Sequence, residues 1–208
     1  ILKERYNYYA LAAYVDFQVG RILHYLDQKN YSANTLVVFW SDHGTQLYDH
    51  GITDKHTFYD ETLRVPLIMR WPGVLKPSTR QFATTLDITS TVAAVAGQTP
   101  PKDWSGFDLV GPLSNGEKSP RTVAVATVYR AYAVVTPTWK LAYFSEQDEG
   151  RLFNRKADPM ERKNLFEDPD HALTRDGLLR ALLRWRVMQD PIGFMQANSR
   201  SGATKGAR

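Results

Sequence analysis

A continuous run of apolar residues at positions 36–40 ends abruptly in an acid, an imidazole and a glycine. β-Branched and aromatic side chains dominate this run and no polar residue alternates with them, which is typical of a strand buried on both faces of a sheet. Asp42 and His43 follow it directly. Open α/β sheets place their ligands at the carboxyl ends of such strands. The sequence therefore predicts an α/β domain with ligand-binding side chains at this edge.

Asp42 and His43 have two interpretations at this stage. An oxygen donor and a nitrogen donor side by side can bind one metal ion. Alternatively, Ser41 or Asp42 caps a following helix and His43 is merely exposed. The residues by themselves leave both open.

The loop after this strand is polar and rich in glycine, and three of the five histidines fall between positions 43 and 56. Between two buried strands, such a loop carries function more often than packing. Lys55 offers a compact positive charge suited to an anionic group, and His56 can donate a hydrogen bond to the same anion. The alternatives are an ion pair between Lys55 and a neighbouring acid, and structural hydrogen bonds for His56.

Hydrophobic spacing predicts the elements around this loop. Apolar residues three and four positions apart favour a helix over about 3–28. A helix followed along the chain by a buried strand is typical of a parallel α/β sheet. A helix over 84–96 should pack through Leu86, Thr89 or Ser90, Ala93 and Ala96 and end at Gly97. The strands predicted for this part of the chain cover residues 35–41 and 65–70.

The pattern changes beyond residue 98. Residues 98–120 are rich in Pro, Gly, Lys and Asp and are interpreted as a long connection. Short β-prone runs with close turns then predict an antiparallel meander with a helix after it. The expected division is one domain over 1–113, a smaller one over 114–198 and a flexible basic tail over 199–208. The elements predicted for the smaller domain are strands at 123–129, 131–136, 139–144 and 151–154 and a helix at 175–189.

Composition excludes several classes of function. The chain has no cysteine, so disulfides, thiolate metal sites and cysteine nucleophiles are absent. Its net charge of +4 is not organised as a basic patch interleaved with aromatics, so no nucleic-acid partner is predicted. No apolar stretch reaches the roughly 20 residues that span a bilayer. The first residue is not Met and no signal peptide follows it, which predicts the later part of a longer protein.

Several motifs in a fixed order resemble the C-terminal portion of the type I sulfatases, in the alkaline-phosphatase-like superfamily. The similarity runs from about residue 6 to 190. The motifs are Ser41-Asp42-His43-Gly44, Leu47-x-x-His50-Gly51, Lys55-His56-Thr57-Phe58-Tyr59-Asp60-Glu61, Arg64-Val65-Pro66, Thr85-Leu86-Asp87-Ile88, Trp139-Lys140-Leu141 and Asp158-Pro159-x-Glu161-x-x-Asn164-Leu165.

This resemblance implies a fold and roles for the loop residues. The fold is α/β: the C-terminal part of a mostly parallel sheet with helices, followed by a small antiparallel sheet with a helix. Asp42 and His43 would be two ligands of a divalent cation, usually Ca²⁺, with His43 standing where many relatives carry asparagine. Lys55 matches the lysine that grips the sulfate oxygens and acts in catalysis, and His56 would be a second substrate contact.

The nucleophile of the family has no counterpart in this chain. Family members attack sulfur with a hydrated formylglycine, made from the Cys or Ser of a Cys/Ser-x-Pro-x-Arg motif in the N-terminal half. The nearest similar stretch has Leu75 in place of the nucleophile and Thr79 in place of the arginine. We therefore expect a sulfatase whose nucleophile lies in an N-terminal part of the same enzyme, so that this chain alone is inactive. The resemblance suggests a sulfated small molecule or glycan as substrate, and a periplasmic, secreted or lysosomal location.

Two other functions stay open. A phosphonate monoester or phosphodiester hydrolase of the same superfamily shares the Ser-Asp-His-Gly loop, because phosphoryl and sulfuryl groups present similar tetrahedral oxygens. A non-catalytic module that binds anions would need no nucleophile.

Overall fold

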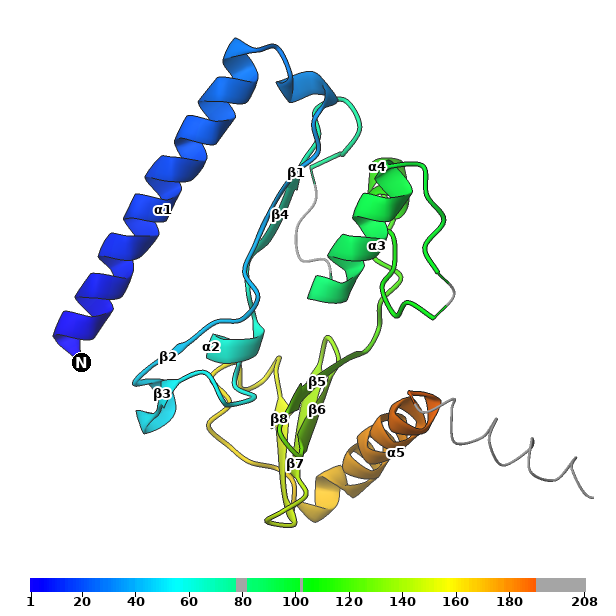
Figure 1. Ribbon diagram of the computed structural model, residues 1–208. Coiled ribbons are helices and arrows are strands. Elements are labelled where there is room, and N and C mark those ends of the chain that lie inside the picture. Colours follow the sequence, from blue (N-terminus) through cyan, green and yellow to red (C-terminus); the bar gives the residue numbers. More distant parts are fainter. Residues whose placement is uncertain (78–81, 102, 190–208) are drawn as a thin grey trace, which may run out of the picture. The chain divides into compact units, whose positions relative to one another are not determined.

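The computed structural model describes residues 1–77, 82–101 and 103–189 (Figure 1). The chain divides into two compact units, Ile1–Ala124 and a second that begins at Val125. The domain boundary expected after residue 113 stays a prediction, and the expected tail over 199–208 lies outside the described residues.

The first unit begins with α1, Leu2–Gln28, which agrees with the helix predicted over 3–28. Val19, Leu23 and Leu26, at helical spacing, are half-buried, and no residue of the helix is fully buried. Large apolar side chains are exposed along it, including Tyr6, Tyr9, Leu11, Tyr14, Phe17 and Ile22. α1 is therefore covered along one narrow stripe only. No helix among the described residues is long and apolar enough to cross a membrane.

The apolar run after α1 forms β1, Val37–Trp40, which pairs antiparallel with β4, Leu67–Arg70. Both strands lie where the sequence predicts them. The expected burial on both faces is wrong for this chain, since Phe39 and Trp40 are 36% and 48% exposed. The physical reason is that β1 and β4 form a sheet of two strands, which offers little surface for a covering layer.

Short elements fill the loop between β1 and β4. β2, Gln46–Leu47, pairs antiparallel with β3, Thr53–Asp54, and a 3₁₀ turn, Asp49–Gly51, lies between them. α2, Asp60–Leu63, follows and leads into β4. The predicted site residues lie in the segments directly before and directly after this hairpin.

α3, Thr85–Val95, also lies where it is predicted, and Gly97 ends it with a φ of +71°. A capping box between Thr84 and Asp87 begins the helix. Ser90 of the predicted packing face is buried, whereas Leu86 is exposed. A further short helix, α4, Val110–Asn115, lies inside the segment interpreted as a connection. The buried residues of α3 are Asp87, Ile88, Ser90 and Thr91.

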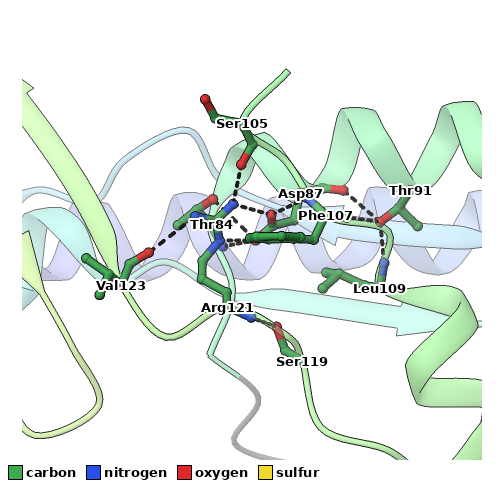
Figure 2. A network of polar contacts seen from close by, with 9 residues as sticks. All are labelled: Thr84, Asp87, Thr91, Ser105, Phe107, Leu109, Ser119, Arg121 and Val123. Carbon is green, nitrogen blue, oxygen red and sulfur yellow. Dashed lines mark hydrogen bonds and ion pairs between the residues drawn. The ribbon is translucent and has the colours of Figure 1, made fainter. Parts of the chain in front are cut away.

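A polar network explains this buried face (Figure 2). Arg121 donates to both carboxylate oxygens of Asp87, from Nε to Oδ2 at 2.8 Å and from a terminal nitrogen to Oδ1 at 2.5 Å. The amides of Phe107 and Thr84 donate to the same carboxylate at 2.8 and 2.7 Å. Arg121 also donates to the carbonyl of Ser105 at 2.8 Å. Asp87 thus joins α3 to two segments that are distant in sequence.

The network makes stability depend on pH. Burial would raise the pKa of Asp87, but hydrogen bonds from Arg121, Phe107 and Thr84 outweigh it and hold that pKa below its usual value. A carboxyl with a lowered folded pKa stabilises fully above its unfolded pKa of about 3.9, and this contribution is lost as the pH falls towards the folded pKa. The stability difference between the wild type and Asp87→Asn should therefore shrink between pH 7 and about pH 3. Urea unfolding over this range measures it, and a constant difference would contradict the expectation.

The second unit is a sheet covered by a helix. Its strands follow the order β5-β6-β7-β8, and β6, β7 and β8 pair antiparallel. α5, Ala172–Met188, packs against β6 and β7. The predicted small antiparallel sheet with a helix is confirmed. The strands are Ala124–Val128, Ala131–Val135, Trp139–Phe144 and Glu149–Asn154, and the core consists of Val134, Leu141, Leu152, Leu165, Leu178 and Leu182.

One buried ion pair lies within this unit. Lys140 on β7 and Glu161 in the loop after β8 are almost completely buried, and Lys140 Nζ lies 2.6 Å from Glu161 Oε1. Two of the motif segments noted in the sequence are therefore in contact through opposite charges.

Candidate functional site

Asp42 and His43 lie directly after β1. The His43 amide donates to Asp42 Oδ1 at 2.9 Å, while the Asp42 side chain is 81% exposed. This hydrogen bond holds the pKa of Asp42 below its usual value, so the carboxylate is ionised at neutral pH. From Gly44 the chain continues to β2 without entering a helix. The alternative that Asp42 caps a helix is therefore excluded.

The His43 ring joins Asp42 to Lys55. Nδ1 lies 2.8 Å from the carbonyl oxygen of Gly44, and Nε2 lies 3.0 Å from Lys55 Nζ. A carbonyl oxygen only accepts and an ammonium only donates, so the contacts assign the hydrogen to Nδ1 and the lone pair to Nε2. Nε2 is also 3.4 Å from Asp42 Oδ2. Three of the four predicted site residues are thus in contact, although Lys55 is twelve positions from His43.

His56 follows Lys55 and is exposed to solvent. Its role as a substrate contact stays a prediction.

Gly44 fixes the segment that carries His43. Its amide donates to the carbonyl of Thr62 in α2 at 2.8 Å. A Cβ at this position would lie 1.9 Å from the carbonyl oxygen of Glu61, so a side chain cannot be accommodated without moving backbone. The glycine of the Ser-Asp-His-Gly motif is therefore required by a close approach of two backbone segments.

Gly44→Ala should destabilise the first unit by about 1–3 kcal/mol, because the clash is with backbone and forces α2 away from the loop. Urea unfolding measures this change. Gly20→Ala on α1 is the matched control, since nothing lies within 4 Å of its added Cβ. Equal unfolding free energies for the two variants would contradict the expected result.

A second group of contacts holds the tip of the hairpin. The His50 ring stacks on Tyr59 with 3.7 Å between centroids, and its Nε2 lies 3.7 Å from Glu61 Oε2. From α1, Arg5 donates to the carbonyl of Leu47 at 2.8 Å and to Asp49 at 3.1 Å. His50 thus has a packing role, and its contact with Tyr59, like that of Arg5 with the hairpin, cannot be read from sequence patterns.

The separation of the Asp42 and His43 donor atoms suits two ligands of one metal ion, but further ligands would be needed. Two donors that each lie about 2.4 Å from one Ca²⁺ at right angles are about 3.4 Å apart. Asp42 Oδ2 and His43 Nε2 have this separation. Histidine is a less typical Ca²⁺ ligand than oxygen. Among the described residues no group of three or more His, Cys, Asp or Glu could hold a metal, so the pair supplies an incomplete coordination sphere.

Comparisons with known proteins concern the family of the chain. Residues 3–98 match the family model described as Sulfatase. The N-acetylglucosamine-6-O-sulfatase of Bacteroides thetaiotaomicron is 32% identical over 191 residues, which cover 85% of this chain and 34% of that protein. A solved structure in complex with its substrate D-glucosamine-2-N,6-O-disulfate has a TM-score of 0.79 at 32% identity, covering 86% of this chain and 39% of its own.

A phosphonate monoester hydrolase of Agrobacterium radiobacter is also similar, with a TM-score of 0.76 at 26% identity over 87% of this chain and 41% of that one. Together the matches define an α/β chain of the alkaline-phosphatase-like superfamily, which confirms the expected fold class. The chain is similar to sulfatases over more than four fifths of its length. It spans about a third of the length of the curated relatives it matches.

Proposed function

We propose that this chain supplies the metal-binding and sulfate-binding side of the active site of a sulfuric ester hydrolase. One observation carries the proposal: an ammonium group, Lys55 Nζ, contacts the same His43 ring nitrogen that lies 3.4 Å from the exposed Asp42 carboxylate. Lys55, a cation that can bind an anionic ester, thus lies next to Asp42 and His43, two side chains that can bind a metal ion.

Each side chain then has a defined role. Asp42 and His43 would hold a divalent cation, most simply Ca²⁺, and the bound cation would polarise a sulfuryl oxygen as a Lewis acid. The hydrogen on His43 Nδ1 puts the lone pair on Nε2, and a cation bound there would take the place of the hydrogen bond from Lys55. Lys55 would bind the ester oxygens and neutralise the charge that develops on the leaving oxygen. His56 would be a second contact to the sulfate group.

The catalytic nucleophile is proposed to be a formylglycine in an N-terminal part of the same enzyme, so the 208-residue chain alone should not hydrolyse sulfate esters. A sulfated glycan is the proposed substrate class. Its support comes from relatives, one named an N-acetylglucosamine-6-O-sulfatase and one solved with a disulfated glucosamine.

Calorimetric titration of the complete enzyme with Ca²⁺ tests the metal role. Asp42→Ala should weaken Ca²⁺ binding at least about tenfold, since it removes a direct ligand. Asp16→Ala, which removes an exposed acid on α1, should leave it unchanged. If Asp42→Ala binds both Ca²⁺ and a sulfated sugar like the wild type, a non-catalytic anion-binding module would be favoured instead.

A phosphonate monoester hydrolase is the second candidate, because such an enzyme is among the similar structures. Both ester classes present tetrahedral oxygens to Lys55. Values of kcat/KM for an aryl sulfate and a phenyl phosphonate, measured on the complete enzyme, separate the two. A preference for the sulfate supports the leading proposal, whereas a preference for the phosphonate supports the second.

A further inference from the structure

We infer that Thr57 is a positioning residue for Lys55, held by a buried polar chain that also fixes the segment bearing His43. This inference rests on the proposed role of Lys55 in binding the ester. Thr57 is not expected to touch the substrate, and its effect would pass through the lysine.

The hairpin that carries Lys55 is too short to fix the lysine by itself. β2 and β3 have two residues each, and Lys55 comes directly after β3. A two-stranded hairpin is marginally stable at best in water. Other contacts must therefore hold Lys55 within 3.0 Å of His43.

Thr57 makes three such contacts. Its amide donates to the carbonyl of Lys55 at 2.9 Å, which closes a tight turn around the lysine. Its hydroxyl accepts from Gln46 Nε2 at 3.1 Å and shares a hydrogen bond with the Thr62 hydroxyl at 2.9 Å. Gln46 and Thr62 are only 2% and 4% exposed, so water cannot readily replace a partner that is lost. The Thr57 hydroxyl therefore connects β2, the Lys55 turn and α2.

Thr62 holds both sides of the candidate site. Its hydroxyl contacts Thr57, and its carbonyl oxygen accepts from the Gly44 amide at 2.8 Å, one residue after His43. One buried residue of α2, Thr62, thus holds in place both the segment that carries Lys55 and the segment that carries His43. Because buried hydrogen-bonded networks specify one arrangement, removing the Thr57 hydroxyl should allow Lys55 to shift relative to His43.

The test compares three variants in the complete enzyme. Thr57→Val keeps the shape and removes the hydroxyl, Thr57→Ser keeps the hydroxyl, and Thr53→Val changes an exposed threonine of the same hairpin. Thr57→Val should lower kcat/KM for a sulfate ester at least about tenfold, because small misplacements of a catalytic group are costly. Thr57→Ser should stay within about twofold of the wild type and Thr53→Val should be unchanged.

A spectroscopic readout reports the position of Lys55 directly. After reductive methylation with ¹³C-formaldehyde, the Lys55 dimethylamine signal is assigned by its loss in Lys55→Arg. This signal should shift from its wild-type position in Thr57→Val, as the contact with His43 loosens, and keep that position in Thr57→Ser. Thermal unfolding confirms that the variants are folded at the assay temperature, and Thr57→Ala replaces Thr57→Val if that variant is not.

Wild-type activity in Thr57→Val, with hydrolysis abolished in Lys55→Ala, would overturn the positioning role and leave the proposed function intact. Lost activity with an unmoved Lys55 signal would also overturn it, since Thr57 would then act by another route. Wild-type hydrolysis in Lys55→Ala would instead overturn the proposed function on which the inference rests.

Discussion

Replacing Arg121 by Met should lower the free energy of unfolding of the first unit by about 3–5 kcal/mol. The Asp87 carboxylate is completely buried and receives two charged hydrogen bonds from Arg121, at 2.8 and 2.5 Å. Methionine keeps much of the bulk of the side chain but leaves this carboxylate without its cation. Removal of one partner from a buried pair is costly because the remaining charge stays desolvated. Urea unfolding measures the change.

The double variant Asp87→Asn/Arg121→Met is the control for this effect. Asparagine keeps an acceptor for one of the two amides, Phe107 or Thr84, and carries no charge, so the double variant should be more stable than Arg121→Met alone. A single variant within about 1 kcal/mol of the wild type, or a double variant no more stable than the single, would contradict a charge-based role for the pair.

Lys140→Met should destabilise the second unit by a similar amount, about 3–5 kcal/mol. Lys140 and Glu161 are almost completely buried and lie 2.6 Å apart. The methionine would remove the ammonium that lies next to the buried Glu161 carboxylate, and a buried charge that loses an ion-pair partner is costly. Unfolding of this unit, followed by circular dichroism, measures the loss.

Two further variants separate charge from packing at this pair. Lys140→Met/Glu161→Gln should recover part of the lost stability, because the buried charge is gone. Lys156→Met, at an exposed lysine beyond β8, should change stability little. If Lys140→Met behaves like Lys156→Met, the pair contributes no stability to the unit.

Regular periodicity made most elements predictable from the sequence. The spacing of apolar residues predicted the helix over 3–28, the apolar strand at 36–40 and the meander after residue 123. The buried face of α3 was not predictable in this way. Periodicity assigns apolar side chains to the core, whereas Asp87 is buried because Arg121, 34 positions away, neutralises it.

The residues of the candidate site were predictable from the sequence, but the contacts that hold them in place were not. Asp42, His43 and Lys55 have chemically distinctive side chains, and their contact is visible in the structure. Thr57 belongs to one of the quoted motifs, but the contacts of its hydroxyl with Gln46 and Thr62 cannot be read from the motif. The requirement for glycine at position 44 depends on the approach of α2, which is a tertiary contact that local sequence does not encode.

The most direct test of the central claim is sulfate-ester hydrolysis by the complete enzyme with Lys55→Ala, compared with Lys3→Ala at the exposed start of α1. We expect kcat/KM to fall by about 10²–10³ in Lys55→Ala, because an electrostatic contact to the developing charge is lost, and to be unchanged in Lys3→Ala. Equal activity of the two variants, or no hydrolysis of sulfate esters by the wild type, would contradict it.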